Sequence, residues 1–405
     1  MKAYVILCAI AGYISGAPIY YRNKIKYLKE RGYEVFVFPV RGGEIFIDDL
    51  REYAGRAYPF LEDYPPEYSE KDRNALVESM AREIPECDEI TVETGSDYTG
   101  YWGELLAKRL GARHFQFLLD EKNPRISGAV MPYFEFKYKR RELACITGDT
   151  LQNYFENSFE IQNADSYALK AVCTNSTEDY DSPITDEIPK NAYMLGYIGR
   201  PSKSFFEPVL DGVIAFAEDV SPERVTFTVF GGDGEEVLSK IRERCTAVSN
   251  LDLFITGYMF PFPEKAIKLH GMFISGAGSR FVSARLGVPT LSMDVYRNRP
   301  FGMVTDNSQA FTRDDYDGRS VFDYIRQILI DKNIPETSGL EPITWDYVTD
   351  AFDRHAEFLS RAEKSLEYYP TEALPLNKKQ KAFKTARTVL GNKGFEKLRK
   401  TKQRF

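Results

Sequence analysis

The order of elements in the first forty residues constrains the fold more than any other feature of the chain. Residues 4–10 form a continuous apolar run, which is typical of a strand buried on both faces. A helical pattern covers residues 19–31 and ends at Gly32, and residues 33–40 are a second predicted strand. Two strands joined by a helix predict a parallel sheet with a right-handed crossover.

The same alternation of strands and helices continues along the chain and starts again after a linker. Residues 181–190 contain two prolines and no periodicity, which indicates a linker. The further predicted strands cover residues 88–93, 114–119, 193–198, 225–230, 251–256, 271–275 and 289–293. We therefore predict an α/β chain with two successive doubly wound, Rossmann-like domains.

Four segments follow from this pattern. Residues 1–185 are expected to form the first domain and residues 191–345 the second. Residues 345–376 contain apolar positions at helical spacing, and we expect a terminal helix packed across the domains. Residues 377–405 form a basic amphipathic tail, so the chain has a C-terminal helical extension.

The tail carries a charge opposite to that of the rest of the chain. It holds eleven Lys and Arg against one acid, Glu396, and because the whole chain carries −7, residues 1–376 carry −17. Its apolar stripe consists of Ala382, Phe383, Ala386, Val389 and Leu390. An acidic body argues against a nucleic-acid binder. The tail is predicted either to lie on an anionic membrane surface or to be a solvated, partly frayed segment.

The cysteines and the N-terminal residues indicate the cellular compartment in which the protein is expected. The five cysteines are widely spaced without a CxxC pair or a histidine cluster, so neither a disulfide framework nor a zinc site is predicted. Lys2 and the apolar residues after it also resemble a signal peptide, but the buried strand is the favoured interpretation. We expect a cytoplasmic protein that associates peripherally with the inner face of the cell membrane.

Ligands of open α/β sheets bind beyond the carboxyl ends of the strands, which makes the loops of the second domain the candidate site. A glycine-rich turn between a strand and a helix favours an anion such as a diphosphate, although glycine there can also serve packing alone. The candidate diphosphate-binding residues are Arg200, Lys203, Gly276, Ala277, Gly278, Ser279 and Arg280. The candidate nucleoside-binding residues are Gly231, Gly232, Gly257 and Tyr258.

Carboxylates at strand ends of the first domain are candidate proton acceptors. Glu93, Asp97 and Asp120 lie at or just after predicted strand ends. Helix capping or solvation is the alternative role for each of them. The three histidines have no metal-ligand spacing, and no metal site is predicted.

Several segments resemble, in order, the landmarks of GT-B glycosyltransferases, especially the family 4 group. They are residues 197–203, 229–235, 252–257, 275–279 and 284–289, together with 16–18 and 28–35 in the first half. The resemblance implies two facing Rossmann-like domains, a diphosphate held by a Gly-Arg loop and a nearby Lys, and an acceptor-side loop at Gly16 and Ala17. It departs from the family because residues 274–282 lack the usual pair of glutamates and no first-domain histidine matches.

The resemblance implies a hexosyltransferase-type enzyme of bacterial or archaeal surface polysaccharide synthesis. Such an enzyme moves a sugar from a nucleotide diphosphate donor to a glycan or glycolipid acceptor. It needs no cofactor and no metal, since cations and a helix terminus stabilise the leaving diphosphate. A nucleotide-sugar 2-epimerase on the same fold and a catalytically silent nucleotide-binding protein are the alternatives.

Overall fold

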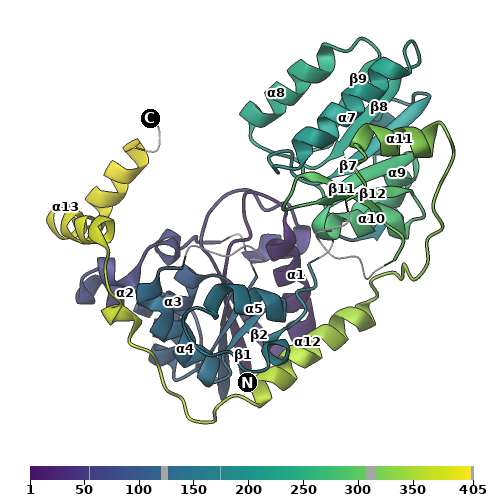
Figure 1. Cartoon of the computed structure of the whole chain (residues 1–405). Helices are drawn as coiled ribbons and strands as arrows, with labels where there is room; N and C mark the ends of the chain where they lie inside the picture. Colours follow the sequence, from purple (N-terminus) through teal and green to yellow (C-terminus); the bar gives the residue numbers. More distant parts are fainter. Residues whose placement is uncertain (54, 120–125, 174, 307–315, 403–405) are drawn as a thin grey trace. The chain divides into compact units, whose positions relative to one another are not determined.

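The computed structural model describes residues 1–53, 55–119, 126–173, 175–306 and 316–402, and the chain divides into two compact units (Figure 1). Unit 1 comprises Met1–Gly12, Tyr20–Val172 and Trp345–Phe405, and unit 2 comprises Tyr13–Ile19 and Cys173–Thr344. Each unit is built on a Rossmann-like, largely parallel sheet with helices. The predicted α/β fold class is therefore confirmed.

Unit 1 contains a five-stranded parallel sheet in the order β2-β1-β3-β4-β5. The strands are β1 Lys2–Cys8, β2 Tyr33–Pro39, β3 Glu89–Thr94, β4 Arg113–Leu118 and β5 Leu143–Cys145. The helices are α1 Gly16–Glu30, which belongs to unit 1 from Tyr20 onward, α2 Glu70–Ala81, α3 Asp97–Leu110, α4 Met131–Lys139 and α5 Gly148–Phe155. Strand order reverses between β1 and β3, so this sheet is doubly wound as predicted.

The helix α12, Trp345–Ser360, packs on unit 1 through its apolar face. Phe352 is buried, and its ring lies 5.6 Å from that of Tyr20 on α1. His355 is also buried, and its Nε2 lies 3.0 Å from the backbone carbonyl of Lys170. Burial lowers the pKa of His355, so this histidine is a neutral core residue.

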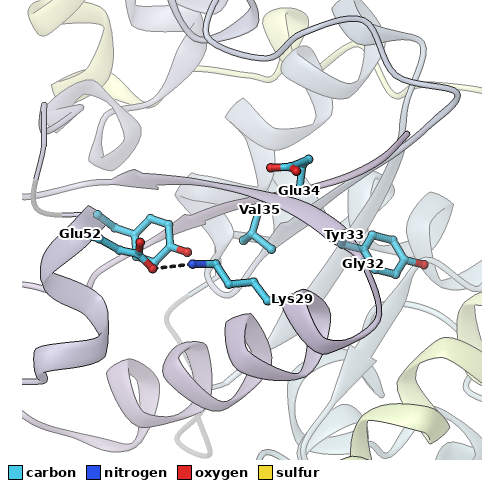
Figure 2. A pocket seen from close by; sticks show the side chains of 7 residues that line it. Lys29, Gly32, Tyr33, Glu34, Val35 and Glu52 are labelled. Carbon is cyan, nitrogen blue, oxygen red and sulfur yellow. Dashed lines mark hydrogen bonds and ion pairs between the residues drawn. The ribbon is translucent and has the colours of Figure 1, made fainter.

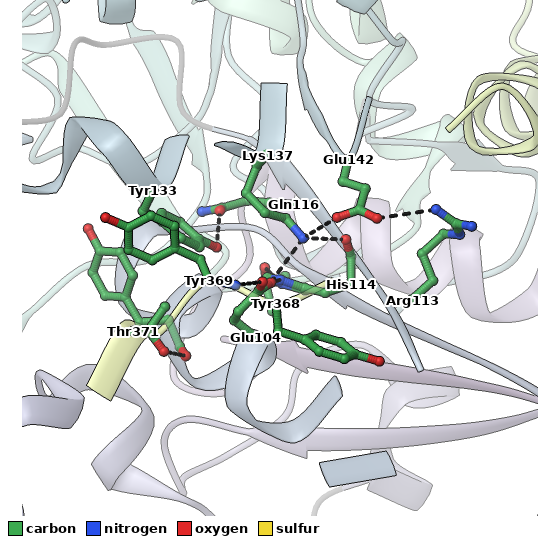
Figure 3. A network of polar contacts seen from close by, with 12 residues as sticks. Glu104, Arg113, His114, Gln116, Tyr133, Lys137, Glu142, Tyr368, Tyr369 and Thr371 are labelled. Atoms are coloured by element: carbon green, nitrogen blue, oxygen red, sulfur yellow. Dashed lines mark hydrogen bonds and ion pairs between the residues drawn. The ribbon is translucent and has the colours of Figure 1, made fainter. Parts of the chain in front are cut away.

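A fully buried network of charged side chains joins α3, α4 and the C-terminal segment of unit 1 (Figure 3). The Lys137 ammonium lies 2.9 Å from a carboxylate oxygen of Glu104 and 2.7 Å from one of Glu142. The other oxygen of Glu104 accepts the backbone N–H of Tyr369 at 2.7 Å. Burial alone would raise the pKa of Glu104, but Lys137, His114 and this N–H lower it to about 2. The network therefore holds the Glu104 carboxylate ionised in the interior.

Unit 2 contains a six-stranded sheet in the order β13-β12-β11-β7-β8-β9, in which only β13 is antiparallel. The strands are β7 Tyr193–Ile198, β8 Val225–Phe230, β9 Leu251–Ile255, β11 Met272–Gly276, β12 Thr290–Asp294 and β13 Arg299–Met303. The helices are α7 Phe206–Asp219, α8 Glu235–Thr246, α9 Glu264–Lys268, α10 Arg280–Arg285 and α11 Val321–Leu329. β6 Thr177–Glu178 and β10 Phe262–Pro263 form a separate short pair.

Unit 2 has an apolar core on its central strands. All six side chains of β8 are buried. The helices α7 and α11 cover the sheet with residues such as Val209, Phe216 and Ile325, which are at most 1% exposed. This continuous apolar pattern is that of a parallel sheet covered on both faces.

The C-terminal helix α13, Lys378–Lys402, contains a kink at Gly391 and belongs to unit 1. Among the described residues, no helix combines the length and the apolar character that crossing a bilayer requires.

Replacing Lys137 with alanine is expected to lower the free energy of unfolding by about 3–5 kcal/mol, because Glu104 and Glu142 would lose their buried cation. The control is Lys139→Ala, since Lys139 on the same helix is exposed and pairs with Glu135. It should cost less than about 1 kcal/mol. Denaturant unfolding followed by circular dichroism measures both, and equal losses would contradict a structural role for the network.

Candidate functional site

The carboxyl ends of three neighbouring parallel strands meet at one edge of the unit 2 sheet. β7 pairs with β8 on one side and with β11 on the other, so that Ile198 lies opposite both Phe230 and Ser275. The loops that follow these strands therefore start in one row. Strand order reverses between β7 and β11, and ligands of open α/β sheets bind at such a reversal.

Hydrogen bonds hold the loops after β7 and β8 together. The Gly199 N–H donates to the Phe230 carbonyl at 3.1 Å, and the Ser202 N–H donates to Asp233 Oδ2 at 2.7 Å. Burial would raise the pKa of Asp233, but the bonds from Ser202 and Gly234 and the nearby Arg200 charge lower it. Asp233 is thus an ionised carboxylate that fixes the first loop.

Arg200 supplies the guanidinium at this edge. Its backbone carbonyl accepts the Tyr197 hydroxyl at 3.2 Å, which fixes the main chain. Its side chain is half-buried, and its guanidinium carbon lies 5.6 Å from the centre of the Tyr13 ring. Among the residues described in this structure, the guanidinium has no hydrogen bond or ion pair. Arg200 can therefore offer its planar set of donors to an anion.

Lys203 and Tyr258 complete this group. Lys203 is exposed, and its backbone N–H donates to the Arg200 carbonyl at 3.2 Å, so the two predicted cations share one turn. Burial raises the pKa of Tyr258, and Asp233 and Tyr13 raise it further, whereas Arg200 opposes the shift. Tyr258 therefore lies within electrostatic range of the Arg200 loop, and the structure brings these predicted residues together.

The predicted glycine-rich turn lies where expected, at the end of β11. Ala277–Ser279 form a 3-10 helix, η6, that leads into α10. A side chain at Gly276 would lie 2.7 Å from the Phe205 ring, so packing alone requires a glycine there. Arg280 is 1% exposed and its Nη1 donates to Ser292 Oγ at 3.2 Å. The predicted contact of Arg280 with a diphosphate therefore has no support in this geometry.

Close packing or a turn explains why glycine occupies each of the three positions predicted to lie near the nucleoside. A Cβ at Gly231 would lie 2.1 Å from the Gly199 carbonyl oxygen, and one at Gly232 would lie 3.0 Å from the Tyr258 ring. Gly257 has φ +75 and lies in open space, as in a left-handed turn. Two of these three glycines thus let the loops after β7, β8 and β9 pack closely.

The predicted acceptor-side residues Gly16 and Ala17 begin α1. A Cβ at Gly16 would lie 3.3 Å from the Cys173 side chain. Residues 13–19 belong to unit 2, the unit that contains Arg200. Tyr13, which the sequence analysis did not single out, belongs to this segment and contacts Arg200. No local pattern marks it, since the two residues are far apart in the sequence.

The predicted proton acceptors differ in their surroundings. Glu93 is 1% exposed, accepts the Tyr20 hydroxyl at 2.6 Å and also that of Tyr4, and lies 3.6 Å from the Lys24 ammonium. Its oxygens thus already have structural partners, and this geometry gives no support to a catalytic role. Asp97 is half-buried at the start of α3, and burial raises its pKa. Asp120 lies outside the described residues.

A surface cavity of about 440 Å³ lies in unit 1, at the amino end of β2 (Figure 2). Lys29, Tyr33, Glu34 and Glu52 are among its lining residues. Lys29 pairs with Glu52 at 2.5 Å, so the cation of this cavity is already neutralised. Nothing in it favours an anionic ligand.

The described residues contain no group of three or more His, Cys, Asp or Glu placed to hold a metal ion. Each histidine instead has a structural environment. His114 Nδ1 lies 2.6 Å from Glu104, and His270 Nε2 lies 2.8 Å from Thr228 Oγ1. Burial lowers the pKa of His270 to about 4, so it is neutral at physiological pH.

Comparisons with solved structures agree with the fold. The chain is 11% identical to Anabaena Alr3699/HepE, solved in complex with UDP-glucose, over 89% of this chain and 95% of that one, with a TM-score of 0.50. The S. aureus MnaA–UDP structure gives 12% identity over 90% and 100% of the two chains and a TM-score of 0.48. A UDP-N-acetylglucosamine 2-epimerase gives 11% over 91% and 99%, with a TM-score of 0.47.

No protein-family model and no curated protein matches the chain. At these identities the likeness to HepE shows a shared fold alone. It agrees with the GT-B type of α/β fold that the resemblance implied.

Replacing Gly231 with alanine is expected to separate the loops after β7 and β8, because the new methyl group would collide with the Gly199 carbonyl. We expect a loss of about 2 kcal/mol or more in the free energy of unfolding. Gly234→Ala is the control, since Gly234 has φ −61 and open space around it. Thermal unfolding of the two variants checks this, and an undisturbed Gly231→Ala protein would contradict the close approach.

Proposed function

We propose that the chain binds a nucleotide diphosphate sugar at the carboxyl edge of the unit 2 sheet, without a metal ion. The observation that carries this proposal is the Arg200 guanidinium, which has no hydrogen bond or ion pair with a described residue and lies in a backbone-fixed loop where strand order reverses. A fold shared with a protein solved in complex with UDP-glucose supports it. UDP is therefore the first nucleotide to test.

The chemistry of the edge suits a diphosphate. Arg200 and Lys203 share one turn and can neutralise two phosphate charges. The backbone of residues 276–279 offers N–H groups at the end of the neighbouring strand. Tyr258, beside Gly232, provides an aromatic ring near the proposed nucleoside position.

For the reaction we propose glycosyl transfer to a glycan or lipid-linked acceptor in polysaccharide synthesis. The bond from the anomeric carbon of the sugar to the diphosphate breaks, and a bond from that carbon to the acceptor oxygen forms. The diphosphate leaves with the bonding electron pair and is stabilised by cations, while the acceptor hydroxyl gives up its proton. Asp97 is the proposed proton acceptor. Asp97 has a raised pKa and forms no hydrogen bond or ion pair with another side chain that the structure describes, whereas Glu93 is engaged in a buried cluster.

Arg200→Ala is expected to weaken UDP binding by about tenfold to a hundredfold, the value of a lost charge-assisted hydrogen bond. Lys203→Ala should weaken it by a smaller factor, since Lys203 is exposed. Arg242→Ala is the matched control, because Arg242 pairs with Glu235 on α8. Calorimetric titration with and without a chelator measures these affinities. Unchanged affinity in both the Arg200 and Lys203 variants would reject this site.

Asp97→Asn is expected to reduce sugar transfer at least a hundredfold while leaving the affinity for UDP unchanged. Because burial raises the pKa of Asp97, the wild-type rate should fall as pH drops through a value above 3.8. Transfer of a radiolabelled sugar from UDP-sugars to glycan or lipid acceptors provides the assay. Release of a C2 label without transfer would select a 2-epimerase, and nucleotide binding without either reaction would select a silent binding protein.

A further inference from the structure

The basic residues of α13 fall into two sets, and the arginines face the protein. Arg387 is 4% exposed and donates to Asp63 at 2.7 Å, and Arg399 donates to the other oxygen of Asp63 at 2.5 Å. The Arg387 guanidinium also lies 4.1 Å from the Tyr68 ring and 4.2 Å from the Phe395 ring. These contacts anchor α13 to the body of unit 1.

The kink of α13 folds its two arms against each other. Gly391 has φ 66 and ψ 164, which interrupts the helix. Across the kink, the Phe383 and Phe395 rings lie 5.4 Å apart, and Arg387 pairs with Glu396 at 3.2 Å. The aromatic part of the predicted apolar stripe is therefore used within the protein. Figure 1 shows α13 as the bent yellow helix near the C-terminus.

The rest of the stripe is left uncovered beside the kink. Val389 is 76% exposed and Leu390 is 48% exposed. Among the described residues, they are the one pair of large hydrophobic neighbours in the sequence that are both strongly exposed. Two adjacent exposed apolar side chains on an anchored helix indicate a contact surface.

The lysines of α13 whose side chains the structure describes face solvent. They are Lys378, Lys379, Lys381, Lys384, Lys393 and Lys397, and the first five form no ion pair with a described residue. Lys378, Lys381 and Val389 share one side of the helix, because spacings of three and eight residues return to the same face. This side of α13 therefore carries both cations and an exposed apolar residue.

We propose that α13 docks the protein on an anionic lipid bilayer, with Val389 and Leu390 inserted among the acyl chains and the lysines on the headgroups. Charge complementarity favours this partner, since residues 1–376 carry −17 and would be repelled by the same surface. The exposed apolar pair favours a bilayer over a nucleic acid or an acidic polysaccharide, which offer no apolar interior. The proposal does not rest on the proposed enzyme activity.

The test is flotation of the full-length protein with vesicles of phosphatidylcholine alone or with about 30 mol% phosphatidylserine. We expect binding to the anionic vesicles alone and its loss at about 1 M salt, where charges are screened. Equal binding to both vesicles, or binding to neither, would overturn the proposal.

Two variants separate the apolar and cationic contributions. Val389→Asp with Leu390→Asp should reduce vesicle binding at least tenfold, and so should Lys378→Glu with Lys381→Glu and Lys384→Glu. The matched controls are Ile334→Asp, at a residue 54% exposed elsewhere, and a triple change of exposed lysines, Lys71→Glu, Lys190→Glu and Lys364→Glu. Circular dichroism confirms that each variant is folded.

The controls decide between specific docking and general attraction. Wild-type binding in both controls supports α13 as the docking surface. An equal loss in the lysine control would show attraction by net charge alone and would overturn the proposal. If the Val389→Asp, Leu390→Asp variant floats normally, insertion into the bilayer is excluded. If the wild type and this variant bind a single-stranded RNA equally tightly, the partner is a polyanion and not a bilayer.

Discussion

The parallel pairing of β7 with β8 on one side and β11 on the other is the constraint on which the candidate site depends. It places the ends of three strands in one row, so that loops distant in the sequence start side by side. The close contact of Gly231 with the Gly199 carbonyl then locks two of these loops together. The Tyr197 hydroxyl fixes the main chain at Arg200, and the proposed ligand contact of this residue depends on that loop.

The buried charged side chains of unit 1 have a structural role, unlike the Arg200 side chain proposed to bind a ligand. Lys137 lies between Glu104 and Glu142, and Lys24 lies near Glu93, all of them in the interior. Burying such groups is costly unless each has charged or hydrogen-bonding partners, and these groups have them. A carboxylate at a strand end can therefore be part of the scaffold, and Glu93 is an example. Asp97, at the start of a helix, is the more open of the two.

Much of the fold was predictable because parallel strands that are buried on both faces have largely apolar sequences. The strands 193–198 and 225–230 match their predicted bounds residue for residue. Two strands were not predicted: β5, which has three residues, and the antiparallel β13, Arg299–Met303, which lacks such a run. The helix α11, Val321–Leu329, was not predicted either, although its sequence has apolar periodicity.

The candidate site was predictable only in part. Loop glycines and the cations after β7 carry local patterns, and they lie together at the expected edge. Whether a side chain faces a ligand or the core depends on its tertiary neighbours. Arg280, turned toward Ser292, and Tyr13, beside Arg200, could not be assigned from local sequence for that reason.

Hydrogen–deuterium exchange with and without UDP tests the central claim most directly, because it maps the ligand onto the backbone without assuming a reaction. The account predicts protection of the amides in residues 199–203, 231–234 and 276–279, at the carboxyl ends of β7, β8 and β11. It predicts no change around the cavity lined by Lys29 and Glu52. Protection at that cavity, with the three loops unchanged, would contradict the account.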